Sequence, residues 1–240
     1  MIPARLAAAG CLAPEEEARL LAASAPDEGV LESWVRRRER GEPLAWVTGT
    51  TTFCGRRLRV DPGVYVPRAQ SEELARRALS LLPRHGQAVD LCTGSGAIAA
   101  CLAGSAGVVG VDIDPRAVAC ARANGVAAVL ADVADLPLPA RAFDLVTAVA
   151  PYVPTPSLGL LPSDVQRYEP RRALDGGHDG LDVVRLVLAA AARLLRPGGW
   201  ALLELGGDQD QALSLPGFDA VRRWSDEDGY LRGLAARSAG

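Results

Sequence analysis

The sequence predicts an α/β protein with a doubly wound, largely parallel sheet of about seven strands that ends in a C-terminal antiparallel hairpin. Two observations lead to this fold class. Short apolar runs alternate with helical stretches between residues 88 and 205, and this order is typical of parallel strands joined by helices. Two further runs, 218–224 and 230–237, flank a turn at 225–229 and predict the hairpin.

Length and composition limit the classes of protein that are possible. The chain has 240 residues, of which 49% are hydrophobic and 23% charged, so we expect one α/β domain with a small appendage. The net charge of −3 gives no basic footprint, and direct nucleic-acid binding is not expected. No apolar run is long enough to span a membrane and no signal peptide is evident, which predicts a cytoplasmic protein without membrane contact.

The cysteines and basic residues exclude several chemistries. The five cysteines form no C-x-x-C pair, so neither a metal site nor a disulfide framework is expected. All 26 basic residues are arginine, which excludes catalysis through a lysine Schiff base. The oligomeric state is not indicated by any pattern in the chain.

The N-terminal part divides into a helical segment, 1–41, and a hairpin linker, 42–66. Pro14 precedes three glutamates, a pattern typical of a first helical turn because acids suit the positive end of the helix dipole. A second helix is expected over 27–40, before a glycine and a proline. Apolar and polar residues alternate with glycines over 44–66, which favours a short hairpin.

The main domain is predicted over 67–240. It opens with a helix over 69–82 that a proline ends. Its strands are expected at 88–92, 108–113, 128–133, 143–150 and 200–205. Its helices are expected at 97–104, 115–123 and 181–195.

A ligand of such a sheet binds at the carboxyl ends of the strands. The first of these ends carries a loop in which glycines allow the backbone to approach a ligand closely. The expected contacts there are Cys92, Thr93, Gly94, Ser95 and Gly96. The spacing of Gly94 and Gly96 also fits a dinucleotide-binding fingerprint, but that signal is weak on its own.

Three aspartates distinguish between the possible cofactors. Asp90 precedes the glycines, where it would repel a pyrophosphate but attract the ammonium and sulfonium of S-adenosylmethionine. Asp112 ends the second strand, beside Ile113, and can accept hydrogen bonds from ribose hydroxyls. Asp132 ends the third and can accept from the adenine amino group, while Val133 packs on the ring. The alternative is that each aspartate caps the following helix. The set of three with the glycine loop favours S-adenosylmethionine over a nicotinamide cofactor.

Five segments in the same order resemble the HemK/PrmC group of protein-(glutamine-N5) methyltransferases, within the class I S-adenosylmethionine-dependent methyltransferases. These enzymes modify peptide chain release factors. The resemblance covers about residues 41–237 and implies a Rossmann-like fold and methyltransferase activity. The matching segments are 41–49, 66–72, 90–97, 149–152 and 164–174.

The fourth strand of that family ends in Asn-Pro-Pro-Tyr, and this chain has Val149-Ala150-Pro151-Tyr152 at these positions. The resemblance implies that the Asn side chain and a backbone carbonyl accept the two N–H bonds of the glutamine amide. It also implies that Val149 borders the cofactor. Valine has no acceptor, whereas the carbonyl at Ala150 survives any substitution. Half of this amide clamp is therefore expected to remain.

Three readings of this substitution stay open. In the first, the protein methylates a glutamine amide of a release factor or another protein, more slowly or with a substitute acceptor group. Alternatively, it methylates a small-molecule amine, carboxylate or hydroxyl, or it binds the cofactor without catalysis. The short N-terminal segment makes a large protein substrate less certain. The residues expected to contact the substrate are Arg68, Tyr152, Tyr168, Glu169 and His178.

Overall fold

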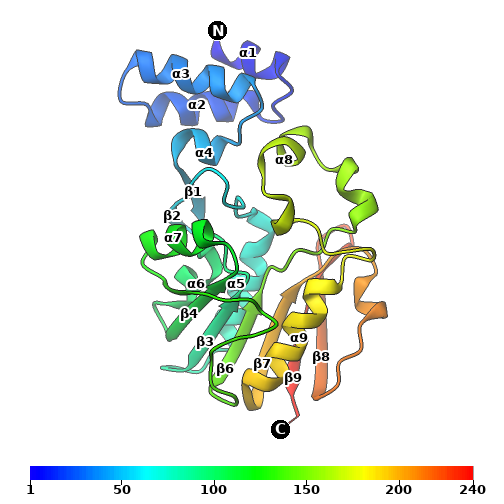
Figure 1. Ribbon diagram of the computed structural model, residues 1–240. Helices are drawn as coiled ribbons and strands as arrows, with labels where there is room; N and C mark the ends of the chain where they lie inside the picture. Colours follow the sequence, from blue (N-terminus) through cyan, green and yellow to red (C-terminus); the bar gives the residue numbers. More distant parts are fainter. Residues whose placement is uncertain (240) are drawn as a thin grey trace.

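A seven-stranded sheet forms the centre of the protein in the computed structural model, which describes residues 1–239 (Figure 1). The strand order is β5-β4-β3-β6-β7-β9-β8. The first five strands in this order run parallel, and the last two pair antiparallel. The strands are β3 (Gln87–Leu91), β4 (Gly107–Asp112), β5 (Ala127–Leu130), β6 (Phe143–Ala148), β7 (Leu195–Glu204), β8 (Phe218–Ser225) and β9 (Leu231–Ser238). The predicted fold class and the C-terminal hairpin are confirmed.

Several strand boundaries differ from the prediction, and each difference has a local cause. Strand β5 ends at Leu130 rather than at 133, because the Asp132 carboxylate accepts a hydrogen bond from the amide of Ala134 and turns the chain. Strand β6 ends at Ala148, three residues before Pro151, which has no amide to donate to a ladder. Asp132 and Pro151 therefore lie just beyond the ends of their strands, whereas Asp90 and Asp112 lie in the last two residues of β3 and β4.

Helices cover both faces of the sheet. Helices α5 (Glu72–Leu81), α6 (Ala97–Leu102) and α7 (Pro115–Ala123) pack on one face, and α9 (Asp182–Leu194) packs on the other. Leu145 and Leu202 pack in the core between the sheet and helices α5, α6 and α7. Their neighbours Val146 and Leu203 pack in the core between the sheet and α9. This alternation is the period of two that a strand requires. No helix within residues 1–239 has the length and apolar character needed to cross a membrane.

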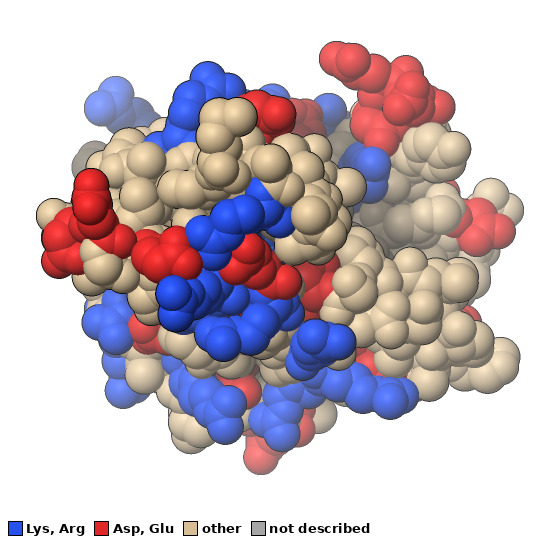
Figure 2. All heavy atoms as spheres, turned by 90° about the horizontal axis from the view of Figure 1, so that it is seen from above, with Lys and Arg blue, Asp and Glu red and all other residues tan. Residues whose placement is uncertain are grey.

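Three short helices form a separate bundle at the N-terminus. They are α1 (Ile2–Ala8), α2 (Pro14–Ser24) and α3 (Glu28–Glu39). Their small core includes Leu6, Leu21 and Val35. Figure 2 looks onto this end of the molecule, where basic and acidic side chains are interspersed. Many of them pair across the helices, as Arg38 does with Glu17 at 2.6 Å.

The segment expected to be a hairpin over 44–66 begins instead with a helix, α4 (Leu44–Thr48). This part of the prediction is wrong, because the Trp46 indole is buried and donates to the Val64 carbonyl at 3.0 Å, a contact that sequence alternation does not reveal. The hairpin is confined to β1 (Thr50–Phe53) and β2 (Arg56–Arg59). Helices α4 and α8 (Ser163–Tyr168) lie between the N-terminal bundle and the sheet (Figure 1).

Candidate active site

The loop after β3 has the backbone conformation that its glycines predict. Cys92, Gly94 and Gly96 all have positive φ values, of 56°, 57° and 81°. A Cβ atom at position 96 would approach the Val126 side chain to 3.0 Å, whereas one at Gly94 would meet nothing within 4 Å. The loop is therefore packed on one side and open on the other, as a ligand-binding turn requires. Burial raises the pKa of the Cys92 thiol, which keeps it protonated.

Asp90 is buried below this loop, with 1% of its surface exposed. Its two carboxylate oxygens accept hydrogen bonds from the hydroxyls of Thr93 at 2.6 Å and Thr147 at 2.7 Å. Burial raises the pKa of this carboxyl to about 6, against the lowering effect of the two threonines. A carboxylate so placed gains from a cationic partner, because a nearby positive charge restores the favourable energy that it loses on leaving water.

Asp112 and Asp132 lie at the next two strand ends. The Asp112 carboxylate accepts from the amides of Gly94 at 2.8 Å and Asp114 at 2.9 Å, and burial raises its pKa. Asp132 is exposed at the turn after β5. Helix α7 is capped by Asp114, which accepts from the Arg116 amide, and α6 begins at Gly96. Neither Asp90 nor Asp112 is therefore the N-cap residue of these helices, although the Asp90 carboxylate also accepts from the Ala99 amide in the first turn of α6.

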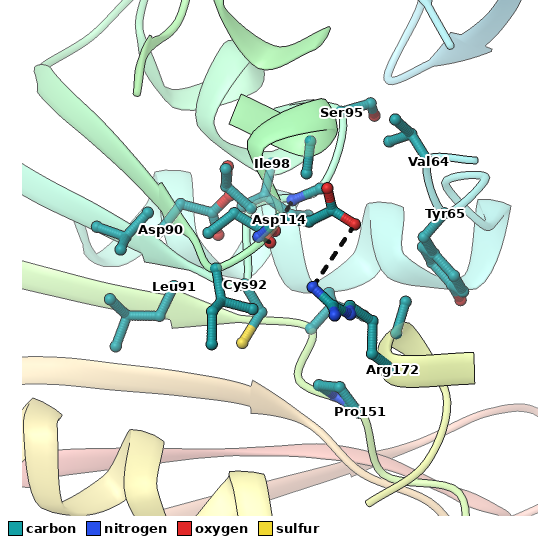
Figure 3. A pocket seen from close by; sticks show the side chains of 18 of the residues that line it. Val64, Tyr65, Asp90, Leu91, Cys92, Ser95, Ile98, Asp114, Pro151 and Arg172 are labelled. Carbon is teal, nitrogen blue, oxygen red and sulfur yellow. Dashed lines mark hydrogen bonds and ion pairs between the residues drawn. The ribbon is translucent and has the colours of Figure 1, made fainter. Parts of the chain in front are cut away.

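A cavity of about 310 Å³, the cofactor cavity, opens at these strand ends (Figure 3). Its volume is in the range of small-molecule sites. The Ser95 hydroxyl at its edge is the buried side-chain polar atom that lacks a partner within the described residues, which suits a site that a polar ligand completes. The lining includes all but one of the residues predicted to bind the cofactor: Asp90, Cys92, Thr93, Gly94, Ser95, Asp112, Ile113, Asp132, Val133 and Val149. The exception is Gly96, which precedes the lining residue Ala97.

A second cavity of about 710 Å³, the acceptor cavity, lies between the N-terminal helices and the residues after β6. It is lined by residues of several distant segments, among them Cys11, Arg68, Ala150 and Leu174. Three residues line both cavities: Tyr65, Val149 and Ala173. Val149 therefore stands where the two cavities meet.

The chain after β6 is held firmly beneath this junction. The Tyr152 hydroxyl donates to the Glu204 carboxylate at 2.9 Å and accepts from the Gln70 amide at 3.1 Å. Glu204 is 2% exposed and also accepts from the Ser71 hydroxyl at 2.5 Å. Burial, followed by the charge of Glu204, raises the pKa of Tyr152, so its phenol stays neutral.

The carbonyls in this segment are available for a ligand. Within residues 1–239, no hydrogen bond runs to the carbonyl oxygens of Val149, Ala150 or Pro151, whereas the Tyr152 carbonyl accepts from the Gln209 side chain at 2.8 Å. The strand end thus offers backbone acceptors beside an apolar side chain.

The loop 175–180 supports the strand end from behind. A Cβ atom at Gly176 would lie 2.6 Å from both the Pro151 carbonyl oxygen and the Gly180 carbonyl oxygen. The Gly176 amide also donates to the Val153 carbonyl at 2.9 Å. This position has room only for glycine, because both neighbours are backbone atoms that cannot move aside.

Not all of the residues predicted to contact substrate reach these cavities. Arg68 and Tyr152 line the acceptor cavity. Glu169 is buried, pairs with Arg68 and accepts from the Val66 amide at 3.3 Å, so its carboxylate is occupied. Tyr168 packs edge-on against Trp46 and donates to the Arg40 carbonyl, and His178 is exposed. The structure places these last three residues outside both linings, and their contact with substrate stays a prediction.

Two residues that the sequence did not single out border the cavities. Tyr65 lines both, and Arg172 reaches across the cofactor cavity to Asp114 at 4.0 Å (Figure 3). The local signal was their position: Tyr65 directly precedes the matched segment 66–72, and Arg172 lies within the matched segment 164–174. Neither position reveals which way a side chain points.

Comparisons with known proteins agree with this geometry. A family described as "Methyltransferase domain" matches residues 88–167. A release factor glutamine methyltransferase of Geobacter sulfurreducens is 42% identical over 85% of this chain and 76% of its own. A 4-amino-L-phenylalanine/4-methylamino-L-phenylalanine methyltransferase of Streptomyces pristinaespiralis is 39% identical over 80% of this chain and 70% of its own.

Solved structures share the fold. The Mtq2-Trm112 complex of E. cuniculi, whose title describes methylation of the translation termination factor eRF1, contains a chain that superimposes with a TM-score of 0.55 at 19% identity. The match covers 73% of this chain and 99% of that one. At this identity the similarity concerns the fold, which is that of Rossmann-like methyltransferases.

Proposed function

The chain belongs to the family of release factor glutamine methyltransferases and is an S-adenosylmethionine-dependent methyltransferase, and from this premise we propose that its methyl acceptor is an amine nitrogen. The observation that carries the proposal is Val149, an apolar side chain at the junction of the two cavities. An acceptor that enters the acceptor cavity meets the cofactor beside this residue.

The nucleophilicity of the acceptor explains why Val149 matters. An amide nitrogen shares its lone pair with the carbonyl, so it becomes a nucleophile only when both N–H bonds are held by acceptors. An amine keeps its lone pair localised and needs only to be aimed. The free carbonyl of Ala150 can accept one N–H, and Val149 packs against the carbon attached to the nitrogen. This half-polar, half-apolar wall suits an amine better than an amide.

An aromatic amine fits best among amines. It is a weak base and is neutral at physiological pH, so it needs no catalytic base before it reacts. The buried carboxylates of Glu169 and Glu204 are both held in hydrogen bonds. The similarity to the Streptomyces pristinaespiralis enzyme, whose name specifies an aromatic amine, supports this choice.

The residues of the chain then have distinct tasks. S-adenosylmethionine supplies, when bound, an electrophilic methyl group on a sulfonium. We assign Asp90 to its ammonium group, Asp112 and Ile113 to the ribose, and Asp132 and Val133 to the adenine. Tyr152, fixed by Glu204, forms the floor on which the acceptor lies. The lining of the cofactor cavity is largely apolar and excludes water from the methyl group.

The first test uses 4-amino-L-phenylalanine as a probe and follows formation of S-adenosylhomocysteine. We expect the native protein to turn over with this compound and to give the N-methylated product by mass spectrometry. L-Phenylalanine, which lacks the ring nitrogen, is the matched control and should give no product. If the aromatic amine gives no more S-adenosylhomocysteine than the control, although the cofactor binds, the proposal of an aromatic amine is wrong.

A glutamine amide of a release factor is the second candidate, favoured by the relatives at 42% identity and by the retained Ala150-Pro151-Tyr152 backbone. Loss of one hydrogen bond to developing charge costs about 2–4 kcal/mol, or roughly 30- to 1000-fold in rate. The intact mass of a release factor from the same organism, incubated with native protein and cofactor, decides this case. A gain of one methyl at a rate equal to that of the amine would favour the amide.

A further inference from the structure

We propose that the hydroxyl of Tyr65 is the side-chain hydrogen-bond group that orients the methyl acceptor in this protein, in place of the group that Val149 cannot provide. The inference rests on the proposed function, since it concerns how an acceptor nitrogen is held beside the methyl group. Tyr65 lies on the segment between β2 and α5, far in sequence from the strand end at Val149.

The position of Tyr65 is the first support. Among residues 1–239, three line both cavities, namely Tyr65, Val149 and Ala173. Valine and alanine have no polar side-chain atom, so the Tyr65 hydroxyl is the sole side-chain hydrogen-bonding group among the described residues that border both cavities. Figure 3 shows Tyr65 on the side of the cofactor cavity opposite Asp90, with its hydroxyl pointing away from Ser95 and Ile98.

The availability of the hydroxyl is the second support. The hydroxyls of Tyr152 and Tyr168 are engaged by Glu204 and by the Arg40 carbonyl, at 2.9 Å each. The partner of the Tyr65 hydroxyl is the Arg68 guanidinium, which donates, so the phenol keeps its own proton and a second lone pair for a ligand. The Arg68 guanidinium lies over the Tyr65 ring, 5.0 Å from its centre, and pairs with Glu169. The ring is thus held in place, and its hydroxyl retains hydrogen-bonding capacity that Arg68 does not use.

The ionisation of Tyr65 suits this role. Burial raises the pKa of the phenol to about 12, so the group is neutral at physiological pH. Its oxygen can accept an N–H, as the Ala150 carbonyl can from the strand end. Two acceptors on facing walls define the direction of the nitrogen lone pair, and this direction is what an in-line methyl transfer requires.

The test uses sinefungin, a cofactor analogue in which a carbon bearing an amino group replaces the sulfur bearing the methyl group. Its amino group occupies the place of the transferable methyl group, next to the acceptor nitrogen, and S-adenosylhomocysteine has no such group. We expect Tyr65→Phe to weaken sinefungin about tenfold, and S-adenosylhomocysteine less than twofold, by isothermal titration calorimetry. Tyr168→Phe, which removes a hydroxyl outside both cavities, is the matched control and should change neither.

The ratio of the two dissociation constants decides the proposal. If Tyr65→Phe leaves this ratio unchanged, whether both ligands weaken together or neither does, Tyr65 does not face the acceptor nitrogen and the inference is wrong. The measurement needs no methyl acceptor, so it stands even if 4-amino-L-phenylalanine is not a substrate. Thermal unfolding of both variants checks that the fold is retained.

Discussion

An Asp90→Asn variant is expected to bind S-adenosylmethionine about 100- to 1000-fold more weakly than the native protein. Asp90 is 1% exposed, and its carboxylate is held in place by Thr93 and Thr147 below the loop that follows β3. Removal of one member of a buried charge pair costs about 3–5 kcal/mol. The amide has the shape of the carboxylate but no charge to offer the ammonium of the cofactor.

Calorimetric titration of the cofactor measures this change. Asp144→Asn is the matched control, because Asp144 lies at the opposite end of the same sheet, where it accepts from the Gln87 amide and pairs with Arg196. We expect its cofactor affinity to stay within a factor of three of the native value. Equal affinities of native protein and Asp90→Asn would contradict the assigned role of Asp90.

The pH dependence of cofactor binding also tests the role of the Asp90 charge, and it does so without a substitution in the protein. Burial raises the pKa of Asp90 to about 6, so the carboxylate is protonated below that value in the free protein. Affinity for the cationic cofactor should therefore fall as the pH drops below about 6, and this fall should be absent in Asp90→Asn.

The contribution of Asp90 to the stability of the free protein has the opposite pH dependence and becomes more favourable at low pH. Because the pKa is higher in the folded than in the unfolded chain, Asp90 destabilises the fold less as the pH falls through 6.

Replacement of Gly176 by alanine should lower kcat about 100-fold with 4-amino-L-phenylalanine and leave cofactor affinity nearly unchanged. The added methyl group would lie 2.6 Å from the carbonyl oxygens of Pro151 and Gly180, so the strand end must shift. A displacement of about 1 Å at the reacting atoms is enough for a 100-fold loss. The cofactor loop at 92–96 is held by other contacts and should not move.

Gly159→Ala is the matched control for this experiment. A Cβ atom at Gly159 would meet nothing within 4 Å, and its φ value is not in the left-handed region. We expect native kcat from this variant, measured as initial rates of S-adenosylhomocysteine formation. A Gly176→Ala protein that keeps native kcat would show that the loop does not position Pro151 and Tyr152.

The features that the sequence predicts well are those with a local cause. The parallel strands appear as apolar runs because both of their faces are buried, as the opposite packing of Leu145 and Val146 illustrates. The loop at 92–96 is recognisable because its glycines are needed for positive φ values. The cofactor cavity could therefore be assembled residue by residue from the ends of the strands.

The acceptor cavity was harder to predict, because contacts between distant segments form it. Arg68 pairs with Glu169 and Gln70 donates to Glu204, and the partners are 101 and 134 residues apart in the chain. The alternation of polar and apolar residues along the chain does not indicate which distant side chains pair. For this reason Glu169 was expected to contact substrate although it is buried in an ion pair, and Tyr65 was missed although it borders both cavities.

The most direct test of the account is the acceptor preference of Val149→Asn compared with the native protein. The measurement is kcat/KM for 4-amino-L-phenylalanine and for a release factor from the same organism, with both proteins. We expect the native protein to prefer the amine and Val149→Asn to gain at least 30-fold on the release-factor glutamine, because the new carboxamide oxygen completes the clamp on the amide. A native protein that prefers the release factor, with no gain on introduction of asparagine, would contradict the claim that Val149 sets the acceptor.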